Sequence, residues 1–325
     1  MAETLTIGKA LNLGLRQAME DDPKVVLMGE DIGKLGGVFR ITDGLQKDFG
    51  EDRVVDTPLA EAGILGTAVG LAMRGYRPVC EIQFDGFVFP AYNQIVTQVA
   101  KIHARSKGML QMPIVIRIPF GGGIGAVEHH SESPEAYFAH TPGLKVVAVS
   151  NPVDAYWGIQ QAIAHPDPIV FFEPKRRYWE KAELDPDATP EPLFGSRLVR
   201  EGDQVTLLAY GPMVKTALQA ASAAEEEGIG VEVIDLRTIA PLDMGPVLDS
   251  VRRTGRCVVV HEAPSNLGLG AELSARITEA CFYELEAPVL RVGGYDTPYP
   301  PSKLEEDYLP DLDRVLDAVD RSLAF

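Results

Sequence analysis

The stretch KVVAVSNPVDAYWGIQQAIAHPDPIVFF, residues 145–172, contains two short runs rich in β-branched residues, separated by a segment long enough for a helix. A strand, a helix and a second strand in that order make the βαβ unit of a parallel sheet. Three similar runs precede this stretch, again with segments of helical length between them: VVLMG (25–29), VCEI (79–82) and IVIRI (114–118). The alternation predicts an α/β fold in which helices cover both faces of a mostly parallel sheet.

The alternation stops at residues 173–195 and resumes after them. This segment, EPKRRYWEKAELDPDATPEPLFG, is charged, rich in proline and without apolar periodicity, as expected of a linker. Four further runs follow, with helical segments between them: VTLLAY (205–210), VEVIDL (231–236), CVVVH (257–261) and PVLRV (288–292). Because 325 residues suffice for two domains, we predict one domain at residues 1–190 and a smaller α/β domain at residues 191–325.

The chain is strongly acidic, with 47 Asp and Glu residues against 30 Lys and Arg, a formal net charge of −17. This charge repels nucleic acid and anionic lipid surfaces, so we expect neither as a partner. No run approaches the roughly 18 to 20 apolar residues that a membrane span requires. The three cysteines are too widely spaced for a zinc site, and the first residues do not resemble a secretory signal, so we expect reduced thiols in a cytoplasmic protein.

Glu61 is a candidate functional residue in the segment DTPLAEAGILGTAVGLAM, residues 56–73. Thr57 is a good helix cap and Pro58 a good first helical residue, which places Glu61 at the fourth helical position, one beyond the acid of a capping box. The helix carries no charge after Glu61, so we expect it to be buried on all sides. Burial raises the pKa of a carboxyl and suits it to sharing a proton with a ligand. The alternative is a solvated first-turn acid favoured by the helix dipole.

Three glycines, Gly63, Gly66 and Gly70, share one side of the same predicted helix. Glycines at this spacing allow another element to approach the helix very closely. The neighbour could be the chain's own sheet or a second subunit.

The segment PFGGGIGA, residues 119–126, matches a dinucleotide-binding fingerprint, but no helix is predicted to begin at these glycines. We expect the loop instead to approach another chain or a ligand closely. His129 and His130 follow it. Either could be an ordinary loop histidine or a proton donor at the mouth of a cleft, and neither has the companions of a metal site. A Gly-Asp-Gly motif followed by Asn, which would hold a magnesium diphosphate, is absent from the sequence.

Several long segments, in the right order, resemble the β subunit of the thiamine-diphosphate-dependent decarboxylating component of 2-oxo acid dehydrogenase complexes. They are DTPLAEAGILG (56–66), EIQFDGFVFPAYNQIV (81–96), EHHSESPEAYFAHTPGLKVV (128–147), FFEPKRRY (171–178), DLRTIAPLD (235–243) and GYDTPYPP (294–301). The resemblance implies a thiamine-diphosphate-binding fold: a parallel-sheet pyrimidine-binding domain followed by a smaller transketolase C-terminal-like α/β domain. It also implies an α2β2 heterotetramer, with the cofactor between subunits and magnesium held mainly by the α subunit.

The resemblance assigns roles to individual residues. Glu61 matches the glutamate that hydrogen-bonds a ring nitrogen of the aminopyrimidine, and His130, with His129 as second choice, matches a histidine that assists acyl transfer. Three positions match residues that contact the aminopyrimidine: Leu59, Gln83 and Phe87. From the residues alone, Gln83 and Phe87 could equally be a polar group at a strand end and a core aromatic.

A monovalent-cation site is doubtful. Where some relatives carry Asp and Asn as ligands for the cation, this sequence has His165 and Asp167. We therefore do not expect bound potassium.

The implied activity is oxidative decarboxylation of a 2-oxo acid, with transfer of the acyl group to the lipoyl group of a dihydrolipoyl acyltransferase. The segments at 81–94 and 129–147 are most similar to the branched-chain, 2-oxoisovalerate type, an enzyme of branched-chain amino acid degradation, and the pyruvate type is the alternative. The chain is expected to be active only with its α subunit. Two other hypotheses remain, a mainly structural assembly subunit and, more weakly, a nicotinamide-binding oxidoreductase.

Overall fold

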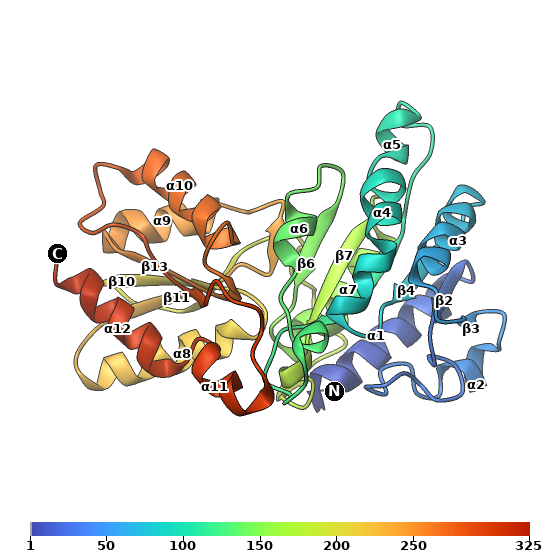
Figure 1. Ribbon diagram of the computed structural model, residues 1–325, viewed down its shortest axis with the longest axis horizontal. Helices are drawn as coiled ribbons and strands as arrows, with labels where there is room; N and C mark the ends of the chain where they lie inside the picture. The colour runs from blue at the N-terminus through green and yellow to red at the C-terminus, as the bar shows by residue number, and fades with distance from the viewer. Residues whose placement is uncertain (1) are drawn as a thin grey trace.

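Two sheets organise the chain in the computed structural model, which describes residues 2–325. Figure 1 shows the seven-stranded sheet and its helices on the right, coloured blue to green, and the five-stranded sheet on the left, coloured yellow to red. Along the described residues, none of the helices combines the length and apolar character needed to cross a membrane.

The larger sheet has the strand order β12-β6-β7-β5-β4-β2-β3, and every neighbouring pair is parallel except β12 with β6. This confirms the mostly parallel sheet predicted from the β-branched runs. Its strands are β2 (Val25–Gly29), β3 (Val54–Asp56), β4 (Arg77–Glu81), β5 (Val115–Phe120), β6 (Lys145–Ala148), β7 (Ile169–Pro174) and β12 (Thr238–Ala240).

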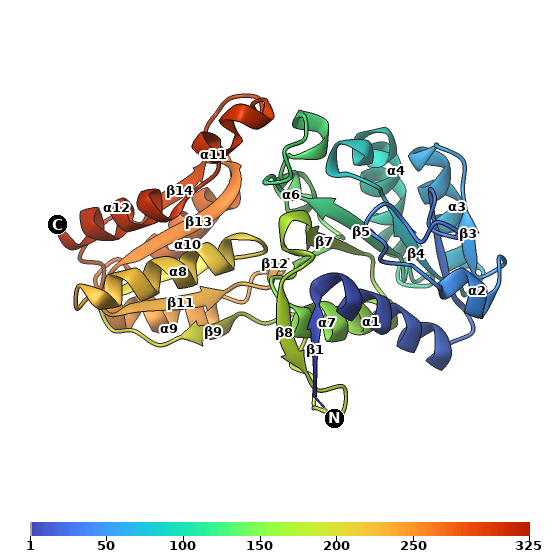
Figure 2. The ribbon, with the colours of Figure 1, turned by 90° about the horizontal axis from the view of Figure 1, so that it is seen from below.

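Helices cover both faces of this sheet. One face packs on α1 (Ile7–Asp21) and α7 (Pro152–Ala164), which lie side by side in Figure 2. The other face is covered by α3 (Glu61–Met73), by η1 (Asp85–Ala91), α4 (Tyr92–Gln94), η2 (Ile95–Val99) and α5 (Ile102–Arg105), and by α6 (Glu135–Ala139). The short α2 (Leu45–Phe49) lies beside β3.

The smaller sheet has the order β14-β13-β10-β11-β9, parallel except for β9. Its strands are β9 (Arg197–Arg200), β10 (Val205–Ala209), β11 (Val231–Asp235), β13 (Cys257–Pro264) and β14 (Leu290–Gly294). In Figure 1, α9 (Gly245–Thr254) and α10 (Leu269–Cys281) lie above this sheet, and α8 (Met213–Glu226) and α12 (Leu312–Leu323) lie below it. Between β14 and α12 come η5 (Ser302–Leu304) and α11 (Glu305–Tyr308).

The predicted linker at 173–195 is wrong in its first half. Glu173, Lys175 and Tyr178 are buried, and η4 (Lys175–Arg177) leads to β8 (Lys181–Leu184), which pairs antiparallel with β1 (Glu3–Thr6). Its charged residues look like linker residues in the sequence, but several form ion pairs inside the larger domain. The division at residue 190 stays a prediction, and β12 shows that one strand from beyond it joins the larger sheet.

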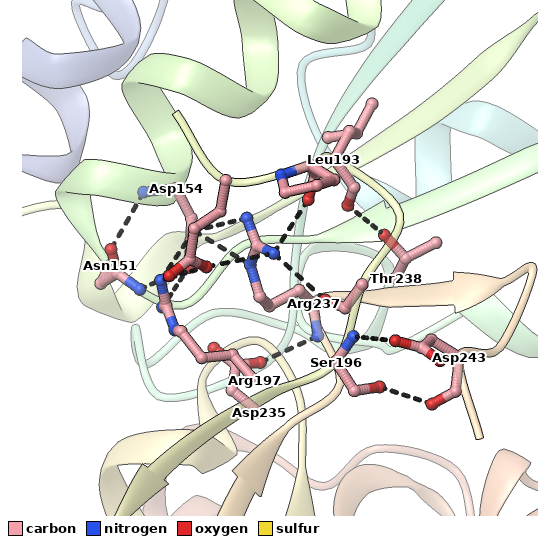
Figure 3. Close-up of polar contacts among 12 residues, drawn as sticks. Asn151, Asp154, Leu193, Ser196, Arg197, Asp235, Arg237, Thr238 and Asp243 are labelled. Carbon is pink, nitrogen blue, oxygen red and sulfur yellow. Dashed lines mark hydrogen bonds and ion pairs between the residues drawn. The ribbon is translucent and has the colours of Figure 1, made fainter. Parts of the chain in front are cut away.

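A buried cluster of charges joins the two sheets near the linker, as Figure 3 shows. Asp154 of α7 pairs with Arg237 (Nε to Oδ1, 3.0 Å) and with Arg197 (Nη2 to Oδ2, 2.7 Å). The Arg237 guanidinium also donates to the carbonyl oxygens of Pro192 and Gly195 at 3.0 and 3.1 Å. One guanidinium therefore holds the connecting chain against α7.

Asp235, at the end of β11, makes this cluster sensitive to pH. Burial first, and then the negative charge of Asp154, raise the pKa of Asp235 to about 7. A raised carboxyl pKa means that the folded state binds the proton more tightly, so stability is lost as pH rises through about 7. We expect Asp235→Asn to unfold at a higher temperature than the parent at pH 8, with the gain shrinking towards pH 5.

Thermal unfolding at four pH values between 5 and 8 checks this expectation. Asparagine keeps the oxygen that accepts from the Arg237 backbone N–H. Asp249→Asn, at an exposed carboxylate, is the control and should show a pH-independent difference. A constant difference for Asp235→Asn as well would contradict the assignment.

Candidate functional site

The candidate residues gather at the carboxyl ends of three adjacent strands, β3, β2 and β4. Glu30 and Asp31 follow β2, Glu61 follows β3 by a short loop, and Gln83 follows β4. In open parallel sheets this edge is where ligands bind, because the loops that leave the strands meet there. The structure therefore brings together segments that are distant in the sequence.

The helix of Glu61 begins later than predicted. α3 starts at Glu61 itself, with Ala60 as the cap position and no side-chain capping bond. Thr57 is not the cap, because its backbone N–H donates to the carbonyl oxygen of Gly29 and so continues the pairing of β3 with β2. Pro58 favours this extended conformation in the residue before it. Leu59, 76% exposed, lies in the extended segment that results.

Glu61 is 8% exposed, and among residues 2–325 its carboxylate has no hydrogen-bond partner. Glu30 lies beside it, 7% exposed, with Oε1 buried and also without a partner. Burial first, and then the charge of Glu61, raise the pKa of Glu30 to about 7. The raised pKa lets the Glu30 carboxyl hold a proton near neutral pH, and buried carboxylate oxygens without partners can take up a polar ligand atom.

Glu30 was missed by the analysis of the sequence. The signal that could have found it is its position directly after the fully buried run VVLMG, at the carboxyl end of a predicted parallel strand. Acids at that edge are candidates for a binding site on topology alone.

α3 is not buried on all sides within this chain. Ile64, Leu65 and Ala68 face the core, whereas Gly66 and Gly70 are exposed, and a Cβ at either would have no neighbour within 4 Å. The prediction that this side packs on the chain's own sheet is therefore wrong. The second alternative, a subunit interface, stays a prediction, and an apolar helix face is open to meet one.

Gln83 and Phe87 contact different parts of the candidate site. The Gln83 amide donates to Asp31 Oδ2 at 3.2 Å. The Phe87 ring is half-buried, and its centroid lies 5.1 Å from that of His130. Phe87 is thus a wall of the site and not a fully enclosed core aromatic. Leu59 is exposed and takes part in none of these contacts.

The His130 ring packs against an aromatic side chain, whereas the His129 side chain is largely exposed to solvent. Both belong to η3 (Glu128–His130), but the His130 ring lies on Phe84, 4.1 Å between centroids, while the His129 side chain is 51% exposed. Burial first, then the neighbouring charges of His129 and Lys175, lower the pKa of His130, which favours the uncharged ring at neutral pH. An uncharged imidazole in a fixed position can accept or relay a proton.

The backbone donors of the glycine loop are occupied by carboxylates of the same chain. The backbone N–H of Gly122 donates to Glu262 at 3.0 Å, and those of Gly123 and Gly125 donate to Glu305 at 2.9 Å each. Two carboxylates of the smaller domain thus occupy the donors that a pyrophosphate would need. The loop therefore contacts its own chain, and its approach to another chain or to a ligand stays a prediction.

Asp167 is paired with a cation of the protein. The Lys145 ammonium lies 2.7 Å from Asp167 Oδ2, and the Asp167 backbone N–H donates to His165 Nδ1 at 3.1 Å. Across the part of the chain that the structure describes, no group of three or more His, Cys, Asp or Glu side chains could hold a metal ion. The three cysteines are free and buried.

The chain has two α/β domains, and the family models place it in the transketolase class. Residues 3–180 match the family model described as "Transketolase, pyrimidine binding domain", and residues 195–315 match "Transketolase, C-terminal domain". A solved structure titled "Split gene transketolase, inactive beta4 tetramer" aligns over 98% of each chain with a TM-score of 0.81 at 23% identity, a likeness of fold.

Relatives of known name identify the family within the transketolase class. "Pyruvate dehydrogenase E1 component subunit beta" of Leifsonia xyli subsp. xyli is 62% identical over 99% of this chain and 96% of its own length. "3-methyl-2-oxobutanoate dehydrogenase subunit beta" of Mycobacterium tuberculosis is 54% identical, over 99% and 93%. "2-oxoisovalerate dehydrogenase subunit beta, mitochondrial" of Dictyostelium discoideum is 45% identical, over 99% and 88%. The chain belongs to the family of E1 β subunits of 2-oxo acid dehydrogenase complexes.

Membership confirms the family inferred from the sequence segments, without distinguishing the branched-chain from the pyruvate type. E1 subunits of this family use thiamine diphosphate, and their β subunits assemble with α subunits into heterotetramers.

Proposed function

We propose that this chain, with an α subunit, catalyses the oxidative decarboxylation of branched-chain 2-oxo acids and passes the acyl group to the lipoyl group of a dihydrolipoyl acyltransferase. The observation that carries the proposal is the buried carboxylate of Glu61, which has no hydrogen-bond partner among the described residues. Glu30 lies beside it, and the pKa of Glu30 is raised to about 7. Relatives named for branched-chain substrates, 54% and 45% identical over nearly the whole chain, support the substrate class. Pyruvate is the second candidate, because the relative at 62% identity is named for it.

The residues at the carboxyl edge fit an aminopyrimidine. Glu61 would hydrogen-bond a ring nitrogen, since its buried carboxylate has no hydrogen-bond partner among the described residues. The ring would be contacted by Leu59, Gln83 and Phe87. When bound, thiamine diphosphate supplies the electron sink for decarboxylation. Magnesium and the diphosphate would be held mainly by the α subunit.

His130 would hold or move a proton during acyl transfer to the lipoyl group. Its ring is fixed on Phe84 and its lowered pKa keeps it uncharged at neutral pH. His129, more exposed, is the second choice. Potassium has no part in the proposal, because Lys145 is paired with Asp167. Three buried free cysteines fit a reducing compartment, and we assign the protein to the cytoplasm.

Co-expression with a candidate α subunit tests the proposal. Reduction of an artificial electron acceptor is measured with and without thiamine diphosphate, comparing 3-methyl-2-oxobutanoate with pyruvate. Cofactor-dependent turnover with a higher kcat/KM for 3-methyl-2-oxobutanoate is the expected result. A higher kcat/KM for pyruvate would show that pyruvate, not a branched-chain 2-oxo acid, is the substrate. An assembled complex that turns over neither acid would contradict the proposed oxidative decarboxylation.

A substitution at Gly66 tests whether the exposed face of α3 binds the α subunit. Gly66→Leu places a side chain on the open face of α3, where no atom of residues 2–325 outside this stretch of helix lies within 4 Å of an added Cβ. Leucine also favours a helix more than glycine. We expect the isolated chain to unfold at the same or a higher temperature, while the dissociation constant for the α subunit rises at least about 10-fold from overpacking. Sedimentation of the mixed subunits measures it.

Gln219→Leu is the matched control, because Gln219 is an exposed polar residue on α8. This variant should leave assembly unchanged. Unchanged assembly in Gly66→Leu as well would place the α subunit on another face.

A further inference from the structure

A buried ion pair lies directly beneath the loop that carries His130. Lys175 and Asp85 are both fully enclosed, and the Lys175 ammonium pairs with Asp85 Oδ1. The same ammonium donates to the backbone carbonyl oxygen of His130 at 2.6 Å. On the other side, Asp85 Oδ2 accepts from the backbone N–H of Glu132 at 2.8 Å. The pair therefore holds the loop at two points that flank the end of η3.

Close backbone packing adds to these bonds. A Cβ at Gly86 would lie 2.4 Å from the backbone oxygen of His129, so the chain after Asp85 touches the loop where a side chain would not fit. The Lys175 ammonium also lies 5.6 Å from the centre of the Phe84 ring, on which the His130 ring rests. Each hydrogen bond of the ammonium thus goes to the loop or to its support.

The His130 imidazole is not oriented by a hydrogen bond at Nδ1. Nδ1 of His130 is buried and has no hydrogen-bond partner among the residues that the structure describes. A histidine in an active site is commonly oriented by a hydrogen bond at one ring nitrogen. Here the position of the ring depends on the loop backbone and on the two phenylalanine rings.

We propose that Lys175 and Asp85 are positioning residues for acyl transfer, which set the place of the His130 imidazole by fixing the backbone on either side of it. The inference rests on the function proposed above for His130. Displacing a catalytic group by about 1 Å can cost about 100-fold in rate. Decarboxylation is expected to depend on the acid pair, and therefore less on this ion pair.

The charged groups around the His130 ring are Lys175, His129 and Glu128, of which the first two lower its pKa and the third raises it. Removing the Lys175 charge takes away one of the lowering causes. The pH profile of acyl transfer should then shift towards higher pH, a change that a purely structural role would not produce.

The test uses the assembled α2β2 enzyme and two assays, reduction of an artificial acceptor and reductive acylation of a free lipoyl domain. Lys175→Met is made alone and together with Asp85→Asn, because the double variant leaves no unpaired buried charge and so keeps the fold. Lys215→Met is the control, since it removes an exposed lysine that is 2.7 Å from Glu180. His130→Asn is the reference for loss of the imidazole.

We expect both Lys175 variants to lose at least about 30-fold in kcat/KM for the lipoyl domain. Acceptor-coupled decarboxylation should stay within about 3-fold, and the control should match the parent in both assays. Equal losses in the two assays, or unchanged acylation in an assembled double variant, would overturn the inference. If acylation is lost in His130→Asn and kept in the Lys175 variants, only this inference fails. If His130→Asn acylates normally, the function proposed for His130 fails with it.

Discussion

Replacing Glu61 by alanine in the assembled enzyme is expected to lower thiamine-diphosphate-dependent decarboxylation by about 100-fold or more, the usual contribution of a group that transfers a proton. Glu61 is buried without a hydrogen-bond partner, and its loss removes the group that would share a proton with a ring nitrogen of the cofactor. Assembly and the unfolding temperature should change little, because no hydrogen bond within the described residues is broken.

The measurement is turnover with an artificial acceptor, normalised to the amount of assembled heterotetramer. Asp313→Ala is the matched control, because Asp313 is an exposed acid in the first turn of α12 and tests the helix-dipole alternative. It should retain the parent activity. Near-normal turnover by a fully assembled Glu61→Ala enzyme would favour the alternative in which this chain is mainly an assembly subunit.

Replacing Arg117 by methionine is expected to destabilise the chain by about 3–5 kcal/mol, the usual cost of leaving buried charges unpaired. Arg117 is buried in β5 and holds two carboxylates from the strands on either side, Glu81 at 2.5 Å and Glu173 at 2.6 and 2.9 Å. The Tyr178 hydroxyl also donates to Glu173 at 2.6 Å. Methionine fills much of the space but leaves both carboxylates without a cation.

Thermal unfolding checks this expectation, with a fall of about 10 °C or more for a domain of this size. Burial raises the pKa of Glu81 and Arg117 lowers it, so removing Arg117 strengthens proton binding in the folded state. The deficit should therefore grow from pH 5 to pH 8. Arg200→Met, which breaks an exposed pair with Glu225, should cost less than about 1 kcal/mol. A loss equally small for Arg117→Met would show that the network contributes little.

Most strands of the two sheets were predictable because the signal is local. A strand buried on both faces needs an almost continuous apolar, β-branched run, and the runs at 25–29 and 169–172 coincide with β2 and most of β7. The α1 helix also has a local signal, a cap at Thr6, whose side chain accepts from the Lys9 backbone N–H. The three-residue strand β12 was not, since its pairing with β6 is settled by distant parts of the chain.

Parts of the site were predictable only through similarity to a family. Glu61 stood out by itself as an acid in an apolar segment, but the expected cap at Thr57 was wrong because backbone pairing with Gly29 holds that residue in the strand. Gln83 and Phe87 had two equal interpretations in the sequence. Their contacts with Asp31 and His130 give them a place in the site.

The sequence by itself determined the alternation of strands and helices, the acidic surface and the candidacy of Glu61, because these depend on residue type and spacing along the chain. Only the tertiary structure decided that Glu30 lies beside Glu61, that Lys175 lies beneath the histidine loop, and that the glycine loop binds carboxylates of its own chain. The physical reason is that burial and charge pairing arise between residues that are far apart in the chain. A charged residue in a proline-rich segment looks solvent-exposed until the partner that neutralises it is brought into contact.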